Sequence, residues 1–196
     1  MSYLETPPDE GEVAPLYEDA RVRYGYVPNY AKVFALRPDV YAAWAQLAGT
    51  IRAGMDLRRY ELVTLATARR LRSSYCSLAH GSVLRDKFYD SATVRDIAVD
   101  HRHAGLEPVD VAVMDFADKV ARDATAVTVD DVDALRAHGL SDVDILQVAL
   151  AAAARCFFST VLDAVGAQPD PEYRDSVESD LRQVLTVGRP VAPAAD

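Results

Sequence analysis

The sequence contains only two cysteines, Cys76 and Cys156, and eighty positions separate them. Two cysteines so far apart do not make the dense disulfide framework of small secreted proteins. The opening residues, MSYLETPPDEGE, are acidic and contain two prolines but no apolar core, so they lack the pattern of a signal peptide. Together these absences predict a reducing, cytoplasmic location.

Positive charge is also scarce, because 21 Lys and Arg stand against 30 Asp and Glu and leave a net charge of -9. Such a chain repels phosphate groups overall, so we expect no nucleic-acid partner and no anionic membrane surface. The apolar runs are too short to predict a membrane span. With 50% hydrophobic and 26% charged residues, the 196 residues suit one globular domain.

No segment alternates between apolar and polar residues as a strand would, whereas the helical period recurs along the chain. The sequence therefore predicts an all-α fold with a flexible leader over 1–12, a single helical domain over 13–187 and a disordered tail over 188–196. About eight to ten helices are expected, and the helix pairs around 57–88 and 129–165 have similar layouts, which suggests an internal duplication. The longer predicted helices cover 13–23, 38–53, 57–71, 76–88, 91–103, 108–122, 128–139, 142–165 and 172–187.

The segment ELVTLATARRLRSSYCSLAH, residues 61–80, gathers a carboxylate, a thiol and an imidazole. Ser73 is placed to cap the helix that carries Cys76 in its first turn, where the unpaired N–H groups and the macrodipole favour a thiolate. His80 follows four residues later, so it shares a helix face with Cys76. Glu61, on the preceding helix, is placed to orient that imidazole. The pattern predicts a nucleophile, a base and an orienting group.

Other interpretations of the same residues stay open. A cysteine and a histidine at this spacing also occur as a buried thiol and a surface imidazole without chemistry. A metal site at Cys76, His80 and Glu61 is disfavoured because no second cysteine pair accompanies them. His101 and His103 point to different sides of a helix, so we expect no metal there either.

Three residues near the segment are candidates for lining a substrate site. Tyr75 is placed either to donate a phenolic hydrogen bond or to pack, and Tyr30 lies in a tyrosine-rich turn that favours aromatic packing or pocket lining. Arg72 belongs to a group of arginines whose members we expect to be solvated or paired with acids of a neighbouring subunit. One or two of them near the site would attract an anionic substrate. The group comprises Arg52, Arg58, Arg59, Arg69, Arg70 and Arg72.

The same segment resembles the active-site signature of the alkylhydroperoxidase AhpD-like branch of the carboxymuconolactone decarboxylase family. That signature is a glutamate, eleven residues, then C-x-x-C-x-x-x-H, and Glu61, Cys76 and His80 match it in type and spacing. Ser73 stands at the position of the first cysteine. The flanks GYVPNYAKVFALRPDVYAAW and GLSDVDILQVALAAAA are similar to those of the family's peroxidase-related members. The resemblance implies an AhpD-like helical fold and a homo-oligomer.

In such proteins the second cysteine attacks a hydroperoxide, becomes a sulfenic acid and is resolved by the first cysteine as a disulfide. Ser73 cannot form that bond. The resemblance therefore implies a thiol-dependent alkyl hydroperoxide reductase, an oxidoreductase without a cofactor, in which Cys76 is the nucleophile and His80 with Glu61 the proton relay. Ser73 would be a hydrogen-bonding substitute, and an external thiol reductant would resolve Cys76. Cys156, expected to be a core residue, is a second possible resolver.

Two alternatives belong to other functional classes. One is a cofactor-free lyase or isomerase, like carboxymuconolactone decarboxylase, in which His80 and Glu61 transfer protons of a small carboxylated substrate. The other is a family member that has lost catalysis and serves in binding or assembly. The first predicts an activity that survives thiol alkylation, and the second predicts an unactivated Cys76.

Overall fold

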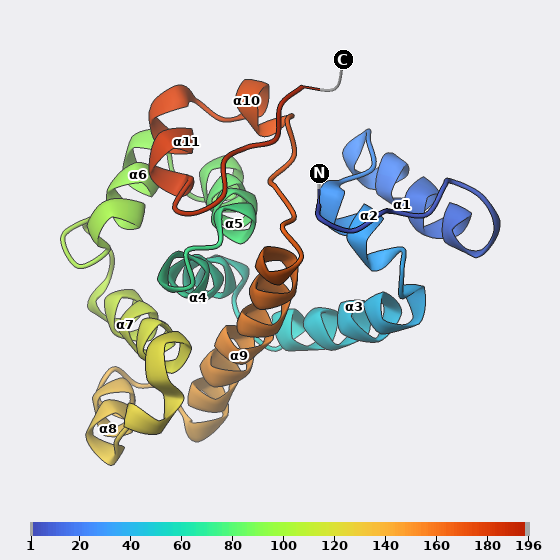
Figure 1. Cartoon of the computed structure of the whole chain (residues 1–196). Helices are drawn as coiled ribbons and strands as arrows, with labels where there is room; N and C mark the ends of the chain where they lie inside the picture. The colour runs from blue at the N-terminus through green and yellow to red at the C-terminus, as the bar shows by residue number, and fades with distance from the viewer. Residues whose placement is uncertain (1, 195–196) are drawn as a thin grey trace.

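The computed structural model describes residues 2–194, and over this range the chain forms eleven α-helices and no β-strand (Figure 1). The predicted all-α class is therefore confirmed. Two short 3-10 helices, Gly11–Val13 and Ala124–Ala126, connect longer elements. The α-helices are α1 (Ala14–Tyr24), α2 (Asn29–Phe34), α3 (Pro38–Ala53), α4 (Leu57–Arg70), α5 (Ser74–Lys87), α6 (Ser91–Asp100), α7 (Pro108–Asp123), α8 (Val129–Ala137), α9 (Asp142–Ala164), α10 (Tyr173–Ser176) and α11 (Ser179–Leu185).

The helix starts follow from local sequence. Prolines occupy the first positions of α3 and α7, where the missing N–H costs no hydrogen bond. Ser141 and Asp144 form a reciprocal capping box at the start of α9. Asp90 is the N-cap of α6, and its side chain accepts a hydrogen bond from the Thr93 backbone N–H at 2.7 Å.

The single helix predicted over 172–187 is two helices in the structure, α10 and α11. The chain between them is extended at Val177, with φ of -123°. Val177 is only 2% exposed and packs in the main apolar core. Burial of this side chain therefore favours a bend over one continuous helix.

Helix α4 lies at the centre of the molecule and packs against α5, α7 and α9 (Figure 1). All residues from Tyr60 to Ala68 are buried, so α4 is covered on every side along this stretch. At its start, Arg58 and Arg59 bind Asp110 of α7 at 2.6 and 3.1 Å. The Asp110 side chain is fully buried, and the two guanidinium groups supply the partners that a buried carboxylate requires.

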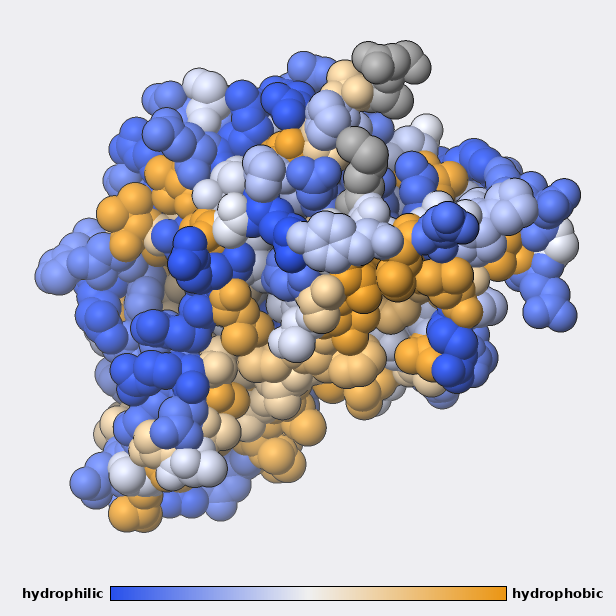
Figure 2. All heavy atoms as spheres, in the orientation of Figure 1, coloured by the Kyte–Doolittle hydropathy of each residue, from blue (hydrophilic) through white to orange (hydrophobic). Residues whose placement is uncertain are grey.

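Helix α9 buries one face and exposes the other. Among the described residues it is the one helix whose length and composition would allow a membrane crossing, with a mean hydropathy of 1.8 and 44% of that window buried. Its exposed apolar residues recur at alternating intervals of three and four, which makes a continuous stripe. Figure 2 shows the apolar surface that α9 and α3 form together. The stripe comprises the apolar residues Val143, Leu146, Leu150, Ala153, Phe157 and Ala164, with the polar Thr160 between the last two.

The two ends of the chain cross the helical domain. The sequence predicts disorder from residue 188, yet Val191 and Ala192 are buried and the Ala192 N–H donates to Pro169 O at 2.9 Å. Near the N-terminus, the Tyr3 N–H donates to Val165 O at 2.8 Å, and Arg189 donates to the Tyr3 hydroxyl at 2.7 Å. Backbone hydrogen bonds hold both terminal segments against the helical domain, and buried apolar side chains add to this at the C-terminal end. Residue 1 of the predicted leader and residues 195–196 of the predicted tail lie outside the described residues.

Candidate functional site

Glu61 of α4 and His80 of α5 form a hydrogen bond inside the molecule. The distance from His80 Nδ1 to Glu61 Oε2 is 2.5 Å, Glu61 is 3% exposed and the His80 side chain 13%. Burial, together with the positive charge of Arg155, lowers the pKa of His80 below its usual 6.5, although Glu61 opposes this shift. The imidazole is therefore neutral near pH 7. With Nδ1–H donated to the carboxylate, Nε2 keeps a free lone pair that can accept a proton.

Cys76 lies in the first turn of α5 and is only 1% exposed. Its sulfur accepts a hydrogen bond from Nη1 of Arg155 in α9 at 3.4 Å. Arg155 is 7% exposed and has no carboxylate partner among the described residues. Burial opposes its charge, but the pKa of the guanidinium is nevertheless raised, because Cys76 and Tyr60 attract the charged form. A buried positive charge thus touches the thiol.

The sequence places Cys76 and His80 on one helix, and the structure keeps them on neighbouring turns of α5. Side chains four residues apart on a helix have Cβ atoms about 5 to 6 Å apart. No hydrogen bond joins Cys76 to His80 within the described part of the chain. Arg155 acts on both groups: it contacts the sulfur and lowers the pKa of the imidazole.

Ser73 occupies the N-cap position of α5, as predicted, but its side chain makes no capping hydrogen bond. The hydroxyl is fully buried and unpaired. Burial raises the pKa of the Asp163 carboxyl, and the nearby Ser73 hydroxyl opposes this rise. The two groups do not reach hydrogen-bond geometry. The expected hydrogen bond from Ser73 to Cys76 is therefore absent from the described residues, and Arg155 is the group that contacts the sulfur.

Tyr75 and Tyr30 lie together in the apolar cluster that contains Cys76. The Tyr75 hydroxyl donates to Asp170 Oδ2 at 2.5 Å and accepts from the Tyr30 N–H at 3.2 Å. Burial and the nearby Asp170 raise the pKa of Tyr75 well above 10, so the phenol stays protonated. Arg72 is exposed and donates to Val187 O at 3.3 Å, in a left-handed backbone conformation. Tyr75 therefore braces the site, and Arg72 lies outside it.

An apolar aromatic wall surrounds the sulfur and the guanidinium. Cys76 packs in one cluster with Phe34 and Phe158, and Trp44 packs against the same cluster. The Phe158 ring stacks on Phe34 and on Trp44, with centroids 5.2 Å apart in both cases. Arg155 lies over the Phe158 ring at 5.4 Å. Apolar surroundings of this kind exclude water from the thiol.

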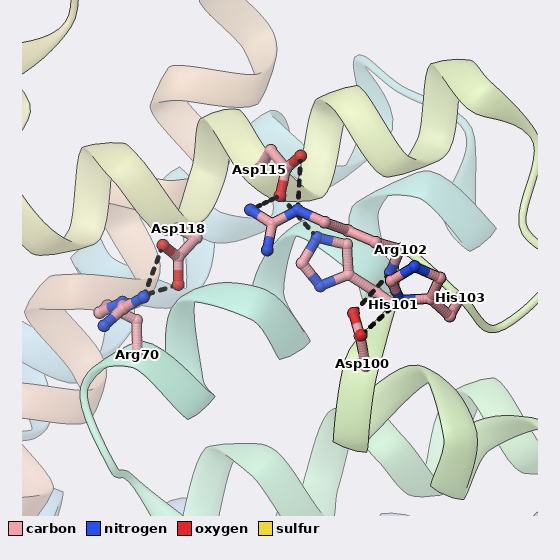
Figure 3. Close-up of polar contacts among 7 residues, drawn as sticks. All are labelled: Arg70, Asp100, His101, Arg102, His103, Asp115 and Asp118. Atoms are coloured by element: carbon pink, nitrogen blue, oxygen red, sulfur yellow. Dashed lines mark hydrogen bonds and ion pairs between the residues drawn. The ribbon is translucent and has the colours of Figure 1, made fainter.

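Cys156 and the histidines outside α5 have other surroundings. Both cysteines are free thiols, and burial raises the pKa of Cys156. His101 hydrogen-bonds to Asp115 and His103 to Asp100, as Figure 3 shows. Residues 2–194 contain no group of three or more His, Cys, Asp or Glu side chains placed to hold a metal ion.

The predicted arginine group is largely satisfied within this chain. Arg58, Arg59 and Arg70 bind carboxylates, and Arg69 donates to Val184 O at 2.8 Å. None of these contacts requires acids from a neighbouring subunit. The arginine that reaches the thiol instead comes from α9.

Sequence reasoning missed the roles of Arg155 and Asp170. The signal for Arg155 was available, since it is the only charged residue between Asp144 and Asp163 in a helix that is otherwise uncharged there. A charge inside a buried helix requires a partner and marks a functional candidate. Asp170 follows two helix-breaking segments, and nothing in its sequence neighbourhood indicates Tyr75 as its partner.

Comparison with solved structures identifies the architecture. A peroxidase-related protein from Ralstonia eutropha, described as an alkylhydroperoxidase AhpD core, superposes with a TM-score of 0.77 at 24% identity, over 96% of this chain and 98% of that one. A peroxidase-related protein from a Silicibacter species superposes with a TM-score of 0.79 at 24% identity, over 88% and 93%. The fold is AhpD-like. No family model and no curated protein sequence matches the chain.

The AhpD-like fold also occurs in the debrominase Bmp8. A variant of that protein with a cysteine replaced by alanine, in complex with 2,3,4-tribromopyrrole, superposes with a TM-score of 0.71 at 16% identity, over 93% of this chain and 95% of that one. Sequence identities this low show a common fold only. The activity of this AhpD-like chain has to be argued from its own residues. Its thiol, imidazole and buried guanidinium are the groups available for chemistry.

Proposed function

We propose that this chain is a thiol-dependent reductase of organic hydroperoxides, related to the AhpD-like peroxidases, and that Cys76 is its nucleophile. The observation that carries the proposal is the 3.4 Å contact between Arg155 Nη1 and Cys76 Sγ. A buried guanidinium without a carboxylate partner attracts a thiolate more strongly than a neutral thiol. The position in the first turn of α5 adds backbone N–H groups that act in the same direction.

The first step transfers one oxygen atom. The Cys76 thiolate attacks the terminal peroxide oxygen of ROOH, the O–O bond breaks, and the products are a cysteine sulfenic acid and an alkoxide. The alkoxide takes a proton and leaves as the alcohol ROH. His80 accepts the thiol proton at Nε2 and returns it to the leaving oxygen, while Glu61 holds Nδ1–H.

The second step restores the thiol and requires an external thiol reductant, since Ser73 cannot form a disulfide. One external thiol condenses with the sulfenic acid and releases water, which leaves a mixed disulfide. A second external thiol attacks that disulfide and releases Cys76 with the oxidised reductant. No bound cofactor takes part in this scheme. Cys156 is half-buried with a raised pKa, so it is a poor attacking thiol.

The aromatic wall supports an organic hydroperoxide over hydrogen peroxide. Phe34, Phe158 and Trp44 pack beside the sulfur and offer contacts only to a hydrocarbon group. Arg155, in turn, offers a charged hydrogen bond to the oxygen that leaves. A substrate with an apolar body and a peroxide end would contact the aromatic wall with the first and Arg155 with the second.

The lyase or isomerase alternative uses the same His80 and Glu61 pair for proton transfer on a carboxylated small molecule. It treats Cys76 as a bystander, and its activity would survive alkylation of that thiol. The debrominase among the structural neighbours, for which a cysteine variant was studied with a bromopyrrole, lends weight to thiol chemistry in this fold.

The experiment that tests the proposal exposes the reduced protein to about one equivalent of cumene hydroperoxide. A sulfenic acid trap, intact mass and peptide mapping then locate the oxidised residue, with Cys156→Ala as the control. We expect rapid oxidation confined to Cys76. A Cys76 that stays a thiol while the peroxide persists would contradict the proposal and favour a screen for lactone or keto-acid turnover.

We also propose that the chain works as a homo-oligomer through α9. The stripe presents Val143 at 73% and Leu146 at 59% exposure, and its partner surface on α3 includes Leu47 at 53%. A helix of 23 residues is about 35 Å long, so the stripe gives a continuous seam for a second copy. Phe157, in the stripe, packs on Trp44 at 5.4 Å, so a second copy would also cover the aromatic wall.

A further inference from the structure

A hollow lies on the side of α4 that faces α6 and α7, whereas Cys76 packs with Ala68 toward α9. Its volume is about 410 Å³, which suits a small molecule. The floor is apolar and buried, formed by Ile97, Ala98 and Met114. Four arginines line it as well, and Figure 3 shows two of them with their acidic partners. These four are Arg69, Arg70, Arg72 and Arg102.

The acids around this cleft are already paired. Asp118 accepts two hydrogen bonds from Arg70, at 2.7 and 2.8 Å (Figure 3). Asp115 is shared between Arg102 at 2.6 Å and His101 at 2.8 Å. Asp100, the remaining carboxylate of the rim, is bonded to a histidine at 2.6 Å. Within residues 2–194, no carboxylate is left over for the other two arginines of the cleft.

Arg69 and Arg72 instead donate to backbone carbonyls, those of Val184 and Val187. Neither has a carboxylate partner among the described residues. Burial lowers the pKa of Arg69, and no neighbouring acid opposes this shift. A partly buried guanidinium without a counter-ion is a costly arrangement in a chain of net charge -9, and an anion in the cleft would relieve it.

We propose that this cleft binds a small organic anion, a carboxylate or phosphate monoester with an apolar body. The free N–H groups of Arg69 and Arg72 bind the anionic end, because guanidinium groups match carboxylate and phosphate geometry. The apolar body lies on Ile97 and Met114. The site is separate from Cys76 and does not depend on hydroperoxide reduction.

The cleft is also connected to the helix that carries Cys76. Arg69 and Arg72 hold the carbonyls of residues 184 and 187, and the next N–H along, that of Gly188, donates to Ser74 Oγ at 2.8 Å. Ser74 is the first residue of α5. An anion that draws the guanidinium groups toward itself therefore loosens the C-terminal segment where it meets the start of α5.

The test measures binding of benzoate and of phenyl phosphate to the full chain by calorimetry, with sodium chloride holding the ionic strength constant. We expect saturable binding of at least one probe, weakened tenfold or more in Arg72→Gln. Arg72 is exposed, so this change removes the charge without opening the core. Arg122→Gln removes the same charge from the exposed end of α7 and should bind as the unmodified chain does.

The two probes distinguish the ligand classes: tighter benzoate binding indicates a carboxylate, and tighter phenyl phosphate binding indicates a phosphate monoester. Hydrogen exchange adds a second readout, since the bound anion should increase exchange over residues 184–188. Absence of saturable binding for both probes would overturn the proposal. Equal affinities in the unmodified chain and in Arg72→Gln would overturn it too, because binding would then lie elsewhere.

Discussion

The guanidinium of Arg155 lies 3.4 Å from the sulfur of Cys76, although 79 positions separate the two residues in the sequence. Helix α9 delivers the guanidinium and α5 delivers the thiol, so the contact depends on how these helices pack. Both side chains are buried, and the low dielectric constant of such surroundings strengthens the interaction of a charge with the sulfur. We expect this contact to govern the reactivity of Cys76, which can be measured directly.

Replacement of Arg155 by methionine should slow alkylation of Cys76. The guanidinium is placed to stabilise the negative charge of the attacking sulfur, and its loss should lower the rate of iodoacetamide modification at about pH 7 by about tenfold or more. Peptide mapping against time gives the rate for Cys76 alone. Arg155→Lys keeps the charge and should retain most of the reactivity. Equal rates in the methionine variant and the unmodified chain would mean that Arg155 is only structural.

Cys76→Ser should abolish consumption of cumene hydroperoxide, since a hydroxyl does not form the sulfenic acid. Cys156→Ala should retain it, because burial keeps that thiol protonated. The assay follows peroxide loss with an external dithiol as reductant. Full turnover in the Cys76 variant would remove the thiol from the mechanism and leave the proton-transfer alternative.

The protein should lose stability on acidification through His80. Its pKa in the folded chain lies below 6.5, the value of the unfolded chain. Between those two values the unfolded state binds more protons, so the free energy of unfolding rises with pH and falls as the pH drops below about 6.5. Urea unfolding of the unmodified chain and of His80→Gln at several pH values checks this. The variant should show a flatter dependence, and parallel curves would contradict it.

Asp110→Ala should destabilise the fold by about 3 kcal/mol, because it leaves Arg58 and Arg59 without their buried partner. Asp118→Ala is the matched control, as it breaks the more exposed pair with Arg70 and should cost less than about 1 kcal/mol. Denaturant titration measures both changes. Similar losses of stability in the two variants would show that burial of the Asp110 ion pairs between α4 and α7 contributes little to stability.

Leu150→Asp, at the middle of the α9 stripe, should shift the chain toward monomer. A carboxylate buried in a seam between two copies would lack a partner. Light scattering after size exclusion gives the mass, and Val99→Asp, an exposed apolar position on α6, is the control. An unmodified chain that is monomeric at all concentrations would refute the oligomer.

Much of the fold follows from local sequence. Prolines and capping residues define the starts of α3, α7 and α9, and these signals act within one helical turn. The sequence predicts no break at Val177, because burial of one side chain, a long-range effect, outweighs helical propensity there. The same limitation explains why Val191 and Ala192 are buried against the domain although the composition of this segment predicts disorder.

For the candidate site, the order of residues specifies which groups exist and how those on one helix are spaced. Cys76 and His80 share α5, and the hydrogen bond of His80 to Glu61 realises a pairing that the spacing predicts. The contact of Arg155, rather than Ser73, with the sulfur and the hydrogen bond of Tyr75 to Asp170 depend on how the helices pack. Spacing fixes neighbours within a helix, whereas contacts between helices depend on packing and on the partner each buried charge requires.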